Sequence, residues 1–299
     1  MPSFLTPQTL SWLGRVVPDA KLGRVQPLAG STSASVYRLD FTNRSSAVLR
    51  QFDVLPDWLK LEPDLALHEA RSLERAAQMN LPTPKLLAFD ESGKECGVPS
   101  VLMSHLAGTV ELNPPNLTGE LDQLAAALSE IHRVSPTDFG WAYAPYADLS
   151  KLTVPTWTTA PQAWAGAIEL LQGPRPTFTP CFIHRDFHPA NVLRQSGQVS
   201  GVVDWVNACV GPAAADVGHC HLNLAQMYGL EAADTFKAAY ARHTGHRQEP
   251  YWDALSLADL VDGPEPPKVY AGWPAFGLTG LTDELIRARL DAFLLSLDF

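Results

Sequence analysis

The sequence of 299 residues has no apolar run that approaches the length of a transmembrane helix. Its first stretch, MPSFLTPQTLSWLGRVV, lacks a basic leader followed by an apolar core, so we expect no signal peptide. None of the four cysteines belongs to a CxxC pair, which favours reduced thiols over a disulfide framework. There is no internal repeat and no low-complexity tail. These absences favour a cytoplasmic globular protein that has no membrane partner.

Positive charge is scarce as well. The 22 Lys and Arg stand against 32 Asp and Glu, which gives a formal net charge of −10 at pH 7. A balance of this sign argues against nucleic acids and anionic membranes as partners. The charge is uneven, because residues 1–60 hold seven Lys or Arg and only four Asp or Glu. The rest of the chain therefore carries the whole acidic excess.

One stretch gathers polar side chains that are hard to explain by packing. Residues 181–205 read CFIHRDFHPANVLRQSGQVSGVVDW, with apolar runs at 181–183, 192–194 and 199–203. The last two runs flank a four-residue connection, 195–198, which contains Gly197 and predicts a hairpin. The polar residues lie on the loop before this hairpin or at its open ends: His184, Asp186, Asn191 and Asp204.

The chemistry of this stretch follows from the types and order of its polar residues. Two carboxylates and an amide at the open end of one hairpin make an all-oxygen site for a hard divalent cation, with Mg²⁺ and a phosphate as the first candidates. The spacing H-R-D-x-x-x-x-N, followed by a hairpin and Asp, is that of a kinase catalytic loop and its metal-binding aspartate. In such loops the first Asp accepts the proton of the attacking hydroxyl.

Several residues of this motif differ from those of protein kinases. His188 stands where Ser/Thr protein kinases usually have Lys, Asp204-Trp205-Val206 replaces the DFG triplet, and no APE sequence follows. HRDFHPANVL…GVVDWVNACVGPAAADVGH instead resembles the aminoglycoside phosphotransferase and choline kinase family, whose signature runs roughly HxDxHxxN…(I/V)DWE…GPxxxDLA. The resemblance is strong over residues 181–221 and moderate over 28–110. It implies phosphoryl transfer that depends on ATP and Mg²⁺.

The expected elements run from strands to helices. After a helix at 5–17, strands at 24–28, 35–41, 46–52, 85–89 and 100–104 accompany a helix at 64–79. Beyond Gly108 the pattern is helical apart from the hairpin, with the later helices at 216–228, 231–243, 251–261 and 282–297. This order predicts an α+β, bilobal protein-kinase-like fold with a small antiparallel-sheet N-lobe and a mostly helical C-lobe. The nucleotide-binding lobe would span residues 1–106, and the catalytic and substrate-binding lobe residues 107–299.

The resemblance implies a role for each catalytic residue. Asp186 would be the catalytic base, and Asn191 with Asp204 would hold Mg²⁺. His184 would brace the loop and Asp204 by hydrogen bonds, without transferring a proton. Asp216 would brace the loop from below, although Asp is also a good helix N-cap. The residues expected to support the site are His184, His188 and Asp216.

The nucleotide contacts are also implied by the resemblance. Arg50 lies near the end of a strand where the best-known members have a Lys that contacts phosphate, and Glu69 on the following helix would pair with it. The alternatives are that Arg50 is a surface residue at a strand end and that Glu69 is a solvated helix residue. A Ser/Thr-rich turn would cover the phosphates, or be only a hairpin tip. A hinge would hold adenine through its main chain. The turn contains Gly30, Ser31, Thr32 and Ser33, and the hinge contains Ser104, His105 and Leu106.

A separate metal site is suggested by the adjacent His219, Cys220 and His221. His219 and His221 are two apart on a helix and point away from each other, which argues against metal binding there.

The acceptor is where the sequence is least informative, because fold and catalytic loop do not specify it. In the resembling family, acceptors include aminoglycosides, macrolides, choline, homoserine and sugars. The acidic remainder of the chain suits a neutral or cationic small-molecule hydroxyl acceptor, or only solubility. Acidic residues late in the chain would either line the acceptor site or lie on the solvated surface. Nearby aromatic residues would either stack on a sugar or amine or pack in the core. These residues are Asp253, Asp259, Asp262, Glu265 and Asp283, with Trp252, Tyr270 and Trp273.

Three other functions compete with this reading. A metal-dependent phosphoesterase would also need carboxylates, but the single Asn–Asp hairpin and the hinge-like stretch favour nucleotide transfer. A catalytically silent, nucleotide-binding pseudokinase is disfavoured because all the catalytic side chains are present. A protein kinase is disfavoured because no obvious activation segment follows Asp204. The sequence does not predict the oligomeric state.

Overall fold

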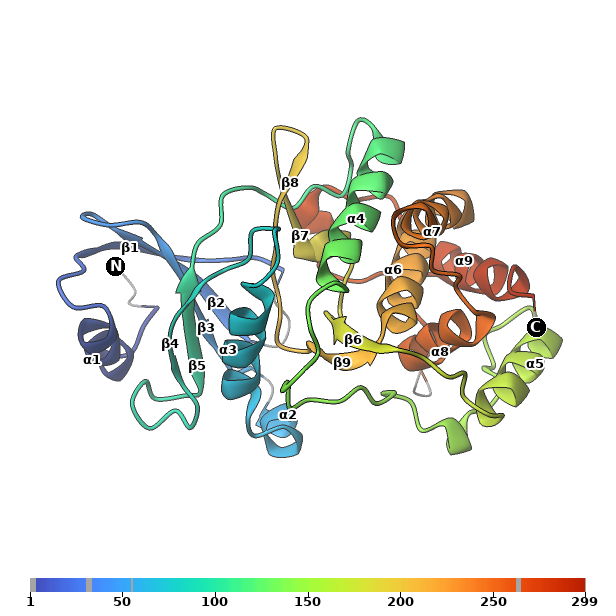
Figure 1. Cartoon of the computed structure of the whole chain (residues 1–299), viewed down its shortest axis with the longest axis horizontal. Coiled ribbons are helices and arrows are strands. Elements are labelled where there is room, and N and C mark those ends of the chain that lie inside the picture. The colour runs from blue at the N-terminus through green and yellow to red at the C-terminus, as the bar shows by residue number, and fades with distance from the viewer. Residues whose placement is uncertain (1–3, 31–33, 55, 262–264, 299) are drawn as a thin grey trace. The chain divides into compact units, whose positions relative to one another are not determined.

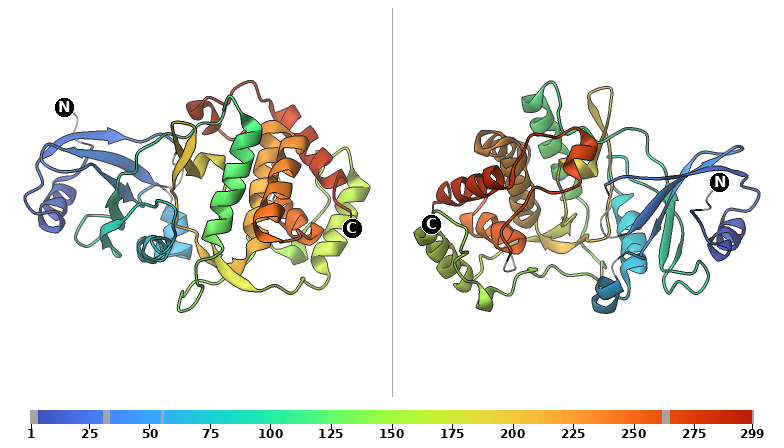
Figure 2. Two further views of the ribbon diagram at one scale, coloured as in Figure 1. Left: turned by 45° about the horizontal axis from the view of Figure 1, so that its top comes forward. Right: turned by 180° about the vertical axis from the view of Figure 1, so that it is seen from behind.

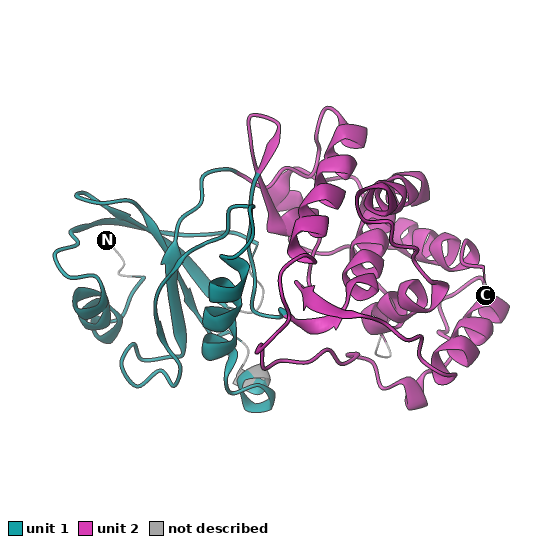
Figure 3. Ribbon diagram, viewed as in Figure 1, with its two compact units in different colours: residues 1–108, 200–208 teal, residues 109–199, 209–299 magenta. Residues whose placement is uncertain are grey.

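The computed structural model describes residues 4–30, 34–54, 56–261 and 265–298 (Figure 1). The chain divides into two compact units (Figure 3). Unit 1 comprises Met1–Gly108 and Ser200–Ala208, and unit 2 comprises Thr109–Val199 and Cys209–Phe299. Residues 200–208 return to the first unit, so Asp204 belongs to unit 1 whereas Asp186 and Asn191 belong to unit 2. Within the described ranges, we find no helix with the length and apolar character needed to cross a bilayer.

Unit 1 is built on a five-stranded sheet in the order β1-β2-β3-β5-β4 (Figure 1). Each neighbouring pair of strands is antiparallel. The strands are β1 (Leu22–Pro27), β2 (Ser35–Phe41), β3 (Ala47–Gln51), β4 (Leu86–Asp90) and β5 (Ser100–Ser104). β3 is central, and Arg50 pairs with Val36 on one side and Val101 on the other. The backbone of Arg50 is therefore fixed from both sides.

Helices cover both faces of this sheet. α1 (Pro7–Val16) starts from Thr6, whose side chain accepts the Thr9 N–H, with proline at the first helical position. α1 packs Trp12 into a core that includes Leu49. α3 (Leu65–Ala76) packs against β4 and β5, and the short α2 (Pro56–Leu61) precedes it. Because side chains alternate along a strand, Leu49 faces α1 while Arg50 points to the opposite face, toward α3.

Unit 2 is mainly helical, and α6 (Ala213–Tyr228) is its centre. Most side chains of α6 are buried, and it packs against α7 (Leu230–Thr244), α8 (Pro250–Leu260) and α9 (Asp283–Leu295). α4 (Leu117–Ile131) runs along α7, as both views of Figure 2 show. α5 (Pro161–Gln172) contacts α8 and α9. The predicted cap of α9 is confirmed, because the Thr282 side chain accepts the Leu285 N–H.

Two small sheets carry residues 181–205. β6 (Pro180–Ile183) pairs antiparallel with β9 (Cys209–Pro212), and β7 (Val192–Gln195) pairs with β8 (Gln198–Val202). Short 3-10 turns lie at Pro189–Asn191, Leu149–Lys151 and Trp273–Phe276. The β7–β8 hairpin turns on Ser196 and Gly197, which have φ values of 53° and 73°. Positive φ at both positions is the two-residue type I′ turn, so the predicted four-residue connection is wrong by one residue at each end.

The predicted fold class is confirmed: the chain is α+β, with an antiparallel sheet in the first unit and a helical second unit. Two expectations need correction. α6 begins at Ala213, three residues before the predicted start, and Pro212 rather than Asp216 is its N-cap. The sequence pattern also missed β9, because a short Gly-Pro run looks like a break until its partner β6 is known.

Candidate active site

An ion-paired cluster in unit 1 joins Arg50 to two carboxylates. Arg50 Nη1 lies 2.8 Å from Glu69 Oε1 and 2.6 Å from Asp204 Oδ1. The Arg50 and Glu69 side chains are buried, so the predicted pairing of these two residues is present, and a surface Arg and a solvated Glu are excluded. Burial alone would lower the pKa of Arg50, but Asp204 and Glu69 raise it. The guanidinium is therefore a fixed positive charge at this position.

Local structure explains how Asp204 reaches this cluster. Asp204 follows β8 and has φ of 68°, a left-handed conformation that Asp adopts more readily than most residues. The buried Trp205 anchors the turn, because its Nε1 donates to the Val202 carbonyl oxygen at 3.0 Å. The aspartate side chain is partly exposed, in contrast to Arg50 and Glu69. Asp204 is thus the member of the cluster that a ligand can reach.

A second cluster, in unit 2, holds the loop that carries Asp186. Asp216 is fully buried, and its two oxygens accept the backbone N–H groups of His184 at 2.8 Å and Arg185 at 2.7 Å. His132 Nε2 contacts the same carboxylate at 3.1 Å. Burial would raise the pKa of Asp216, but the hydrogen bonds from His132 and the His184 amide hold it below its usual range. Asp216 thus bonds to the loop backbone and has no capping bond to α6.

Asp186 is surrounded by nitrogen atoms. Its N–H donates to His184 Nδ1 at 3.3 Å, and Asn191 Nδ2 donates to its carbonyl oxygen at 2.8 Å and to Oδ2 at 3.2 Å. Oδ1 lies 3.5 Å from His188 Nε2 and 3.1 Å from His219 Nε2. Burial would raise the pKa of Asp186, but the imidazoles of His188 and His219 hold it well below its usual range. The carboxylate is therefore ionised at neutral pH.

His219 is a neighbour of Asp186 that sequence reasoning did not place there. Its signal was its position three residues after Asp216, which places both on one face of α6. The expectation that His219 and His221 point apart is confirmed. His221 is buried and contacts Asp234 Oδ1 at 3.1 Å and Asp253 Oδ1 at 3.2 Å, whereas His219 faces Asp186.

The predicted hinge and phosphate-covering loop are described only in part. The Ser104 N–H donates to Lys85 O at 2.8 Å, and the His105 N–H donates to Ser46 O at 3.3 Å. Leu106 packs over Gly201, where an added Cβ would lie 2.5 Å from Leu106 Cδ1. Gly30 has φ of 99°, a conformation that favours glycine. Ser31, Thr32 and Ser33 lie outside the described residues.

Several candidate acceptor residues have other roles. Asp253 is buried, and its Oδ1 accepts from Gln248 Nε2 at 3.1 Å, so it is neither solvated surface nor open to an acceptor. Trp252 and Trp273 are also buried, which supports core packing. Asp259 accepts the N–H groups of residues 146 and 147, each at 2.9 Å. Asp283 accepts the N–H of residue 269, Glu265 and Tyr270 are exposed, and Asp262 lies outside the described residues.

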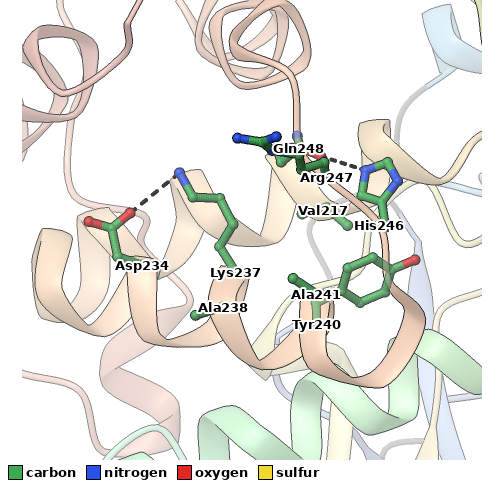
Figure 4. Close-up of a pocket in the computed structure, with 9 residues that line it drawn as sticks. All are labelled: Val217, Asp234, Lys237, Ala238, Tyr240, Ala241, His246, Arg247 and Gln248. Atoms are coloured by element: carbon green, nitrogen blue, oxygen red, sulfur yellow. Dashed lines mark hydrogen bonds and ion pairs between the residues drawn. The ribbon is translucent and has the colours of Figure 1, made fainter.

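Two pockets among the described residues lie in unit 2. A pocket of about 390 Å³ is lined mainly by α7 and the segment after it, with Lys237 Nζ 3.4 Å from Asp234 Oδ1 (Figure 4). A second pocket, of about 570 Å³, shares Tyr240, His246 and Arg247 with the first. The second pocket is also lined by His132, which contacts Asp216, and by the candidate acceptor residue Trp252, whereas neither pocket is lined by Asp186, Asn191 or Asp204.

Comparisons with known proteins agree with the fold and the motif. The sequence profile of the phosphotransferase enzyme family, APH, matches residues 24–257. A homoserine kinase from Methylocella silvestris is 29% identical over 223 residues, which make up 67% of this chain. The chain spans 64% of the length of that relative.

Solved structures share the architecture. A thermostable mutant of aminoglycoside phosphotransferase APH(4)-Ia, in a ternary complex with AMP-PNP and hygromycin B, has a TM-score of 0.65 at 15% identity, covering 97% of this chain and 99% of that one. Macrolide 2'-phosphotransferase MphH from Brachybacterium faecium has a TM-score of 0.59 at 16% identity, covering 82% of this chain and 86% of that one. At these identities the likeness is one of fold. The family profile extends from β1 into α8, and the chain belongs to the phosphotransferase enzyme family.

Proposed function

We propose that this protein is a small-molecule kinase that transfers the γ-phosphoryl group of ATP, with Mg²⁺, to a hydroxyl group of its acceptor. The observation that carries the proposal is the environment of Asp186, an ionised carboxylate on a loop whose backbone is fixed by the buried Asp216. Membership of the phosphotransferase family and the spacing of Asp186, Asn191 and Asp204 support the same reaction.

Asp186 is the proposed base. In the loose transition state of phosphoryl transfer the hydroxyl proton leaves late, so a carboxylate of low pKa is sufficient. Its main task is to orient the hydroxyl in line with the phosphorus, and the hydrogen bonds from Asn191 to its carbonyl and carboxylate oxygens restrict its rotation. His184 Nδ1 accepts the Asp186 N–H and His188 Nδ1 accepts the Ala190 N–H, and these hydrogen bonds are proposed to support the loop.

Asn191 and Asp204 are the proposed Mg²⁺ ligands, and their free oxygens fit this ion. The Asn191 amide nitrogen is occupied by two oxygen acceptors, which turns its Oδ1 away from them. Asp204 uses Oδ1 for Arg50, so Oδ2 remains for a cation. Hard oxygen donors are the ligands that Mg²⁺ prefers. Mg²⁺, when bound, supplies charge neutralisation at the transferring phosphates.

Unit 1 is the proposed nucleotide-binding lobe, as the predicted division at residues 106 and 107 implies. Arg50 Nη1 is taken by two carboxylates, and Nη2 forms no hydrogen bond with any described residue, so it is available to a phosphate oxygen. Glu69 orients the guanidinium from α3. The proposed adenine contacts are main-chain groups of Ser104, His105 and Leu106, with the Leu106 N–H as donor because the other two N–H groups are bonded within the sheet.

The acceptor is proposed to be a small molecule with a hydroxyl group, and a cationic amine suits the acidic chain. One relative is named a homoserine kinase, and one solved relative holds hygromycin B beside AMP-PNP, so both metabolic and antibiotic acceptors are candidates. The four free cysteines fit a reducing compartment, and we propose the cytoplasm.

The test is release of ADP from Mg·ATP with a panel of acceptors that includes homoserine, choline, ethanolamine, amino sugars, aminoglycosides and macrolides. We expect one acceptor class to raise the rate in the wild type and not in Asp186→Ala. A wild-type protein that binds Mg·ATP but responds to no acceptor would support the pseudokinase instead. No thermal stabilisation by Mg·ATP would contradict the proposed nucleotide site.

A further inference from the structure

Three side chains of unit 2 bring two imidazole nitrogens to one carboxylate oxygen. Asp186 Oδ1 lies 3.1 Å from His219 Nε2 and 3.5 Å from His188 Nε2, and one ligand atom from each residue lies within 4.8 Å of the others. The side chains are 31% exposed for Asp186 and His219 and 14% for His188. An ion from solution can therefore reach this group.

Two of the three separations between the ligand atoms are close to those of a metal site. Zn²⁺ binds His nitrogen at about 2.0–2.1 Å and carboxylate oxygen at about 2.0–2.2 Å, so tetrahedral ligands lie about 3.3 Å apart. The two distances from Asp186 Oδ1, 3.1 and 3.5 Å, lie on either side of this value. Two imidazoles with one carboxylate suit Zn²⁺ and related transition metals, whereas Mg²⁺ prefers oxygen ligands alone.

The supporting structure places these ligands on different elements. His219 is on α6, where Asn223 Nδ2 donates to its carbonyl oxygen at 2.9 Å and also lies 3.1 Å from its Nε2, so coordination through Nε2 displaces this amide from the ring. His188 precedes the 3-10 turn, and its Nδ1 accepts the Ala190 N–H at 3.3 Å. Coordination through His188 Nε2 moves the ring proton to Nδ1 and breaks this long hydrogen bond. Metal binding therefore costs the hydrogen bonds that these two rings make without the ion.

We propose that Asp186, His188 and His219 bind one transition-metal ion of the Zn²⁺ class, and that this ion inhibits phosphoryl transfer. Binding stands on the geometry of the three side chains. Inhibition rests on the proposed function, because the ion occupies the Asp186 oxygen that would receive the hydroxyl proton. The site differs from the proposed Mg²⁺ ligands, Asn191 and Asp204, in both residues and donor atoms.

Binding is tested with Co²⁺, which substitutes for Zn²⁺ and absorbs visible light strongly when its coordination is tetrahedral. Full-length wild type is titrated without nucleotide, beside His219→Gln, His188→Gln and the matched control His243→Gln. His243 also contacts a carboxylate, Asp122 Oδ1 at 3.3 Å, but belongs to no three-ligand group among the described residues. Thermal unfolding of each variant establishes that it is folded.

We expect one Co²⁺ per chain in the wild type and the control, and binding at least about 10-fold weaker in the His219 and His188 variants. No tetrahedral spectrum in the wild type, or unchanged binding by His219→Gln, would overturn the site. A sulfur-to-cobalt charge-transfer band would place the ion on cysteine and overturn it as well.

Inhibition is tested in the ADP-release assay with Zn²⁺ and excess Mg²⁺. We expect Zn²⁺ to slow the wild type and His243→Gln but not His219→Gln. Equal inhibition of all three would place the inhibitory ion at the nucleotide and overturn this part. If no acceptor supports turnover, the proposed function fails, while the Co²⁺ titration still decides whether the metal site exists.

Discussion

Replacing Asp216 by Ala tests whether this carboxylate fixes the loop that carries Asp186. The change removes the acceptor of two backbone N–H groups, those of His184 and Arg185, and the contact to His132. Asp216 has no exposed surface, so water cannot replace it without entering the core. An unsatisfied buried donor costs about 1–3 kcal/mol, so two of them give a destabilisation of about 2–6 kcal/mol.

The assay combines urea unfolding followed by circular dichroism with initial rates measured where the variant is still folded. We expect the unfolding midpoint to fall and kcat to drop about 100-fold, because a small misplacement of the reacting groups is enough for such a loss. The control is Asp122→Asn, which removes an exposed ion pair with Arg242 and should cost less than about 1 kcal/mol. A variant Asp216→Ala as stable and active as this control would refute the bracing role.

Three further predictions follow from the contacts. Glu69→Gln should raise KM for Mg·ATP with less effect on the acceptor KM, since it releases one side of the Arg50 guanidinium; equal effects on both constants would contradict this. Gly201→Ala should lower stability in thermal unfolding by about 1–3 kcal/mol, because its Cβ would lie 3.0 Å from the backbone oxygen of Pro82 and 2.5 Å from Leu106 Cδ1. Gly14→Ala, with open space, should not destabilise. Burial would lower the pKa of His221, but Asp234 and Asp253 raise it above 6.5, so the stability that charged His221 contributes is complete below pH 6.5 and is lost as pH rises. Urea unfolding of wild type and His221→Gln on both sides of pH 6.5 should therefore show that the difference in stability between them shrinks at high pH. A difference that grows with pH would rule this out.

The sequence predicted the elements whose signals are local. The strands of unit 1 and the helices of unit 2 follow from alternation and helical periodicity, and their ends differ from the predictions by a few residues. Arg50 and Glu69 were paired correctly because a central strand and the helix packed on its sheet must meet. The spacing of Asp186, Asn191 and Asp204 predicts phosphoryl transfer because that chemistry needs such groups on one loop and one hairpin, and the roles of these residues stay a prediction.

What the sequence could not predict depends on contacts between distant segments. β9 exists only through its pairing with β6, and its own residues look like a chain break. The second ion pair of Arg50, to Asp204, joins residues 154 positions apart. His219 became a candidate only when α6 was seen to direct one face toward Asp186. Burial reversed other expectations, since Asp253 looks like a surface carboxylate until His221 and Gln248 are placed beside it.

The most direct test of the proposed function is a comparison of wild type with Asp186→Asn, measuring kcat for ADP release and Kd for Mg·ATP on the same preparations. Asn has nearly the same shape as Asp, and the backbone carbonyl oxygen of residue 186 still accepts the hydrogen bond from Asn191 Nδ2. The loop should therefore keep its structure. We predict a fall in kcat of at least about 100-fold, with Kd for Mg·ATP little changed. A kcat close to that of wild type would contradict the assignment of Asp186 as the base.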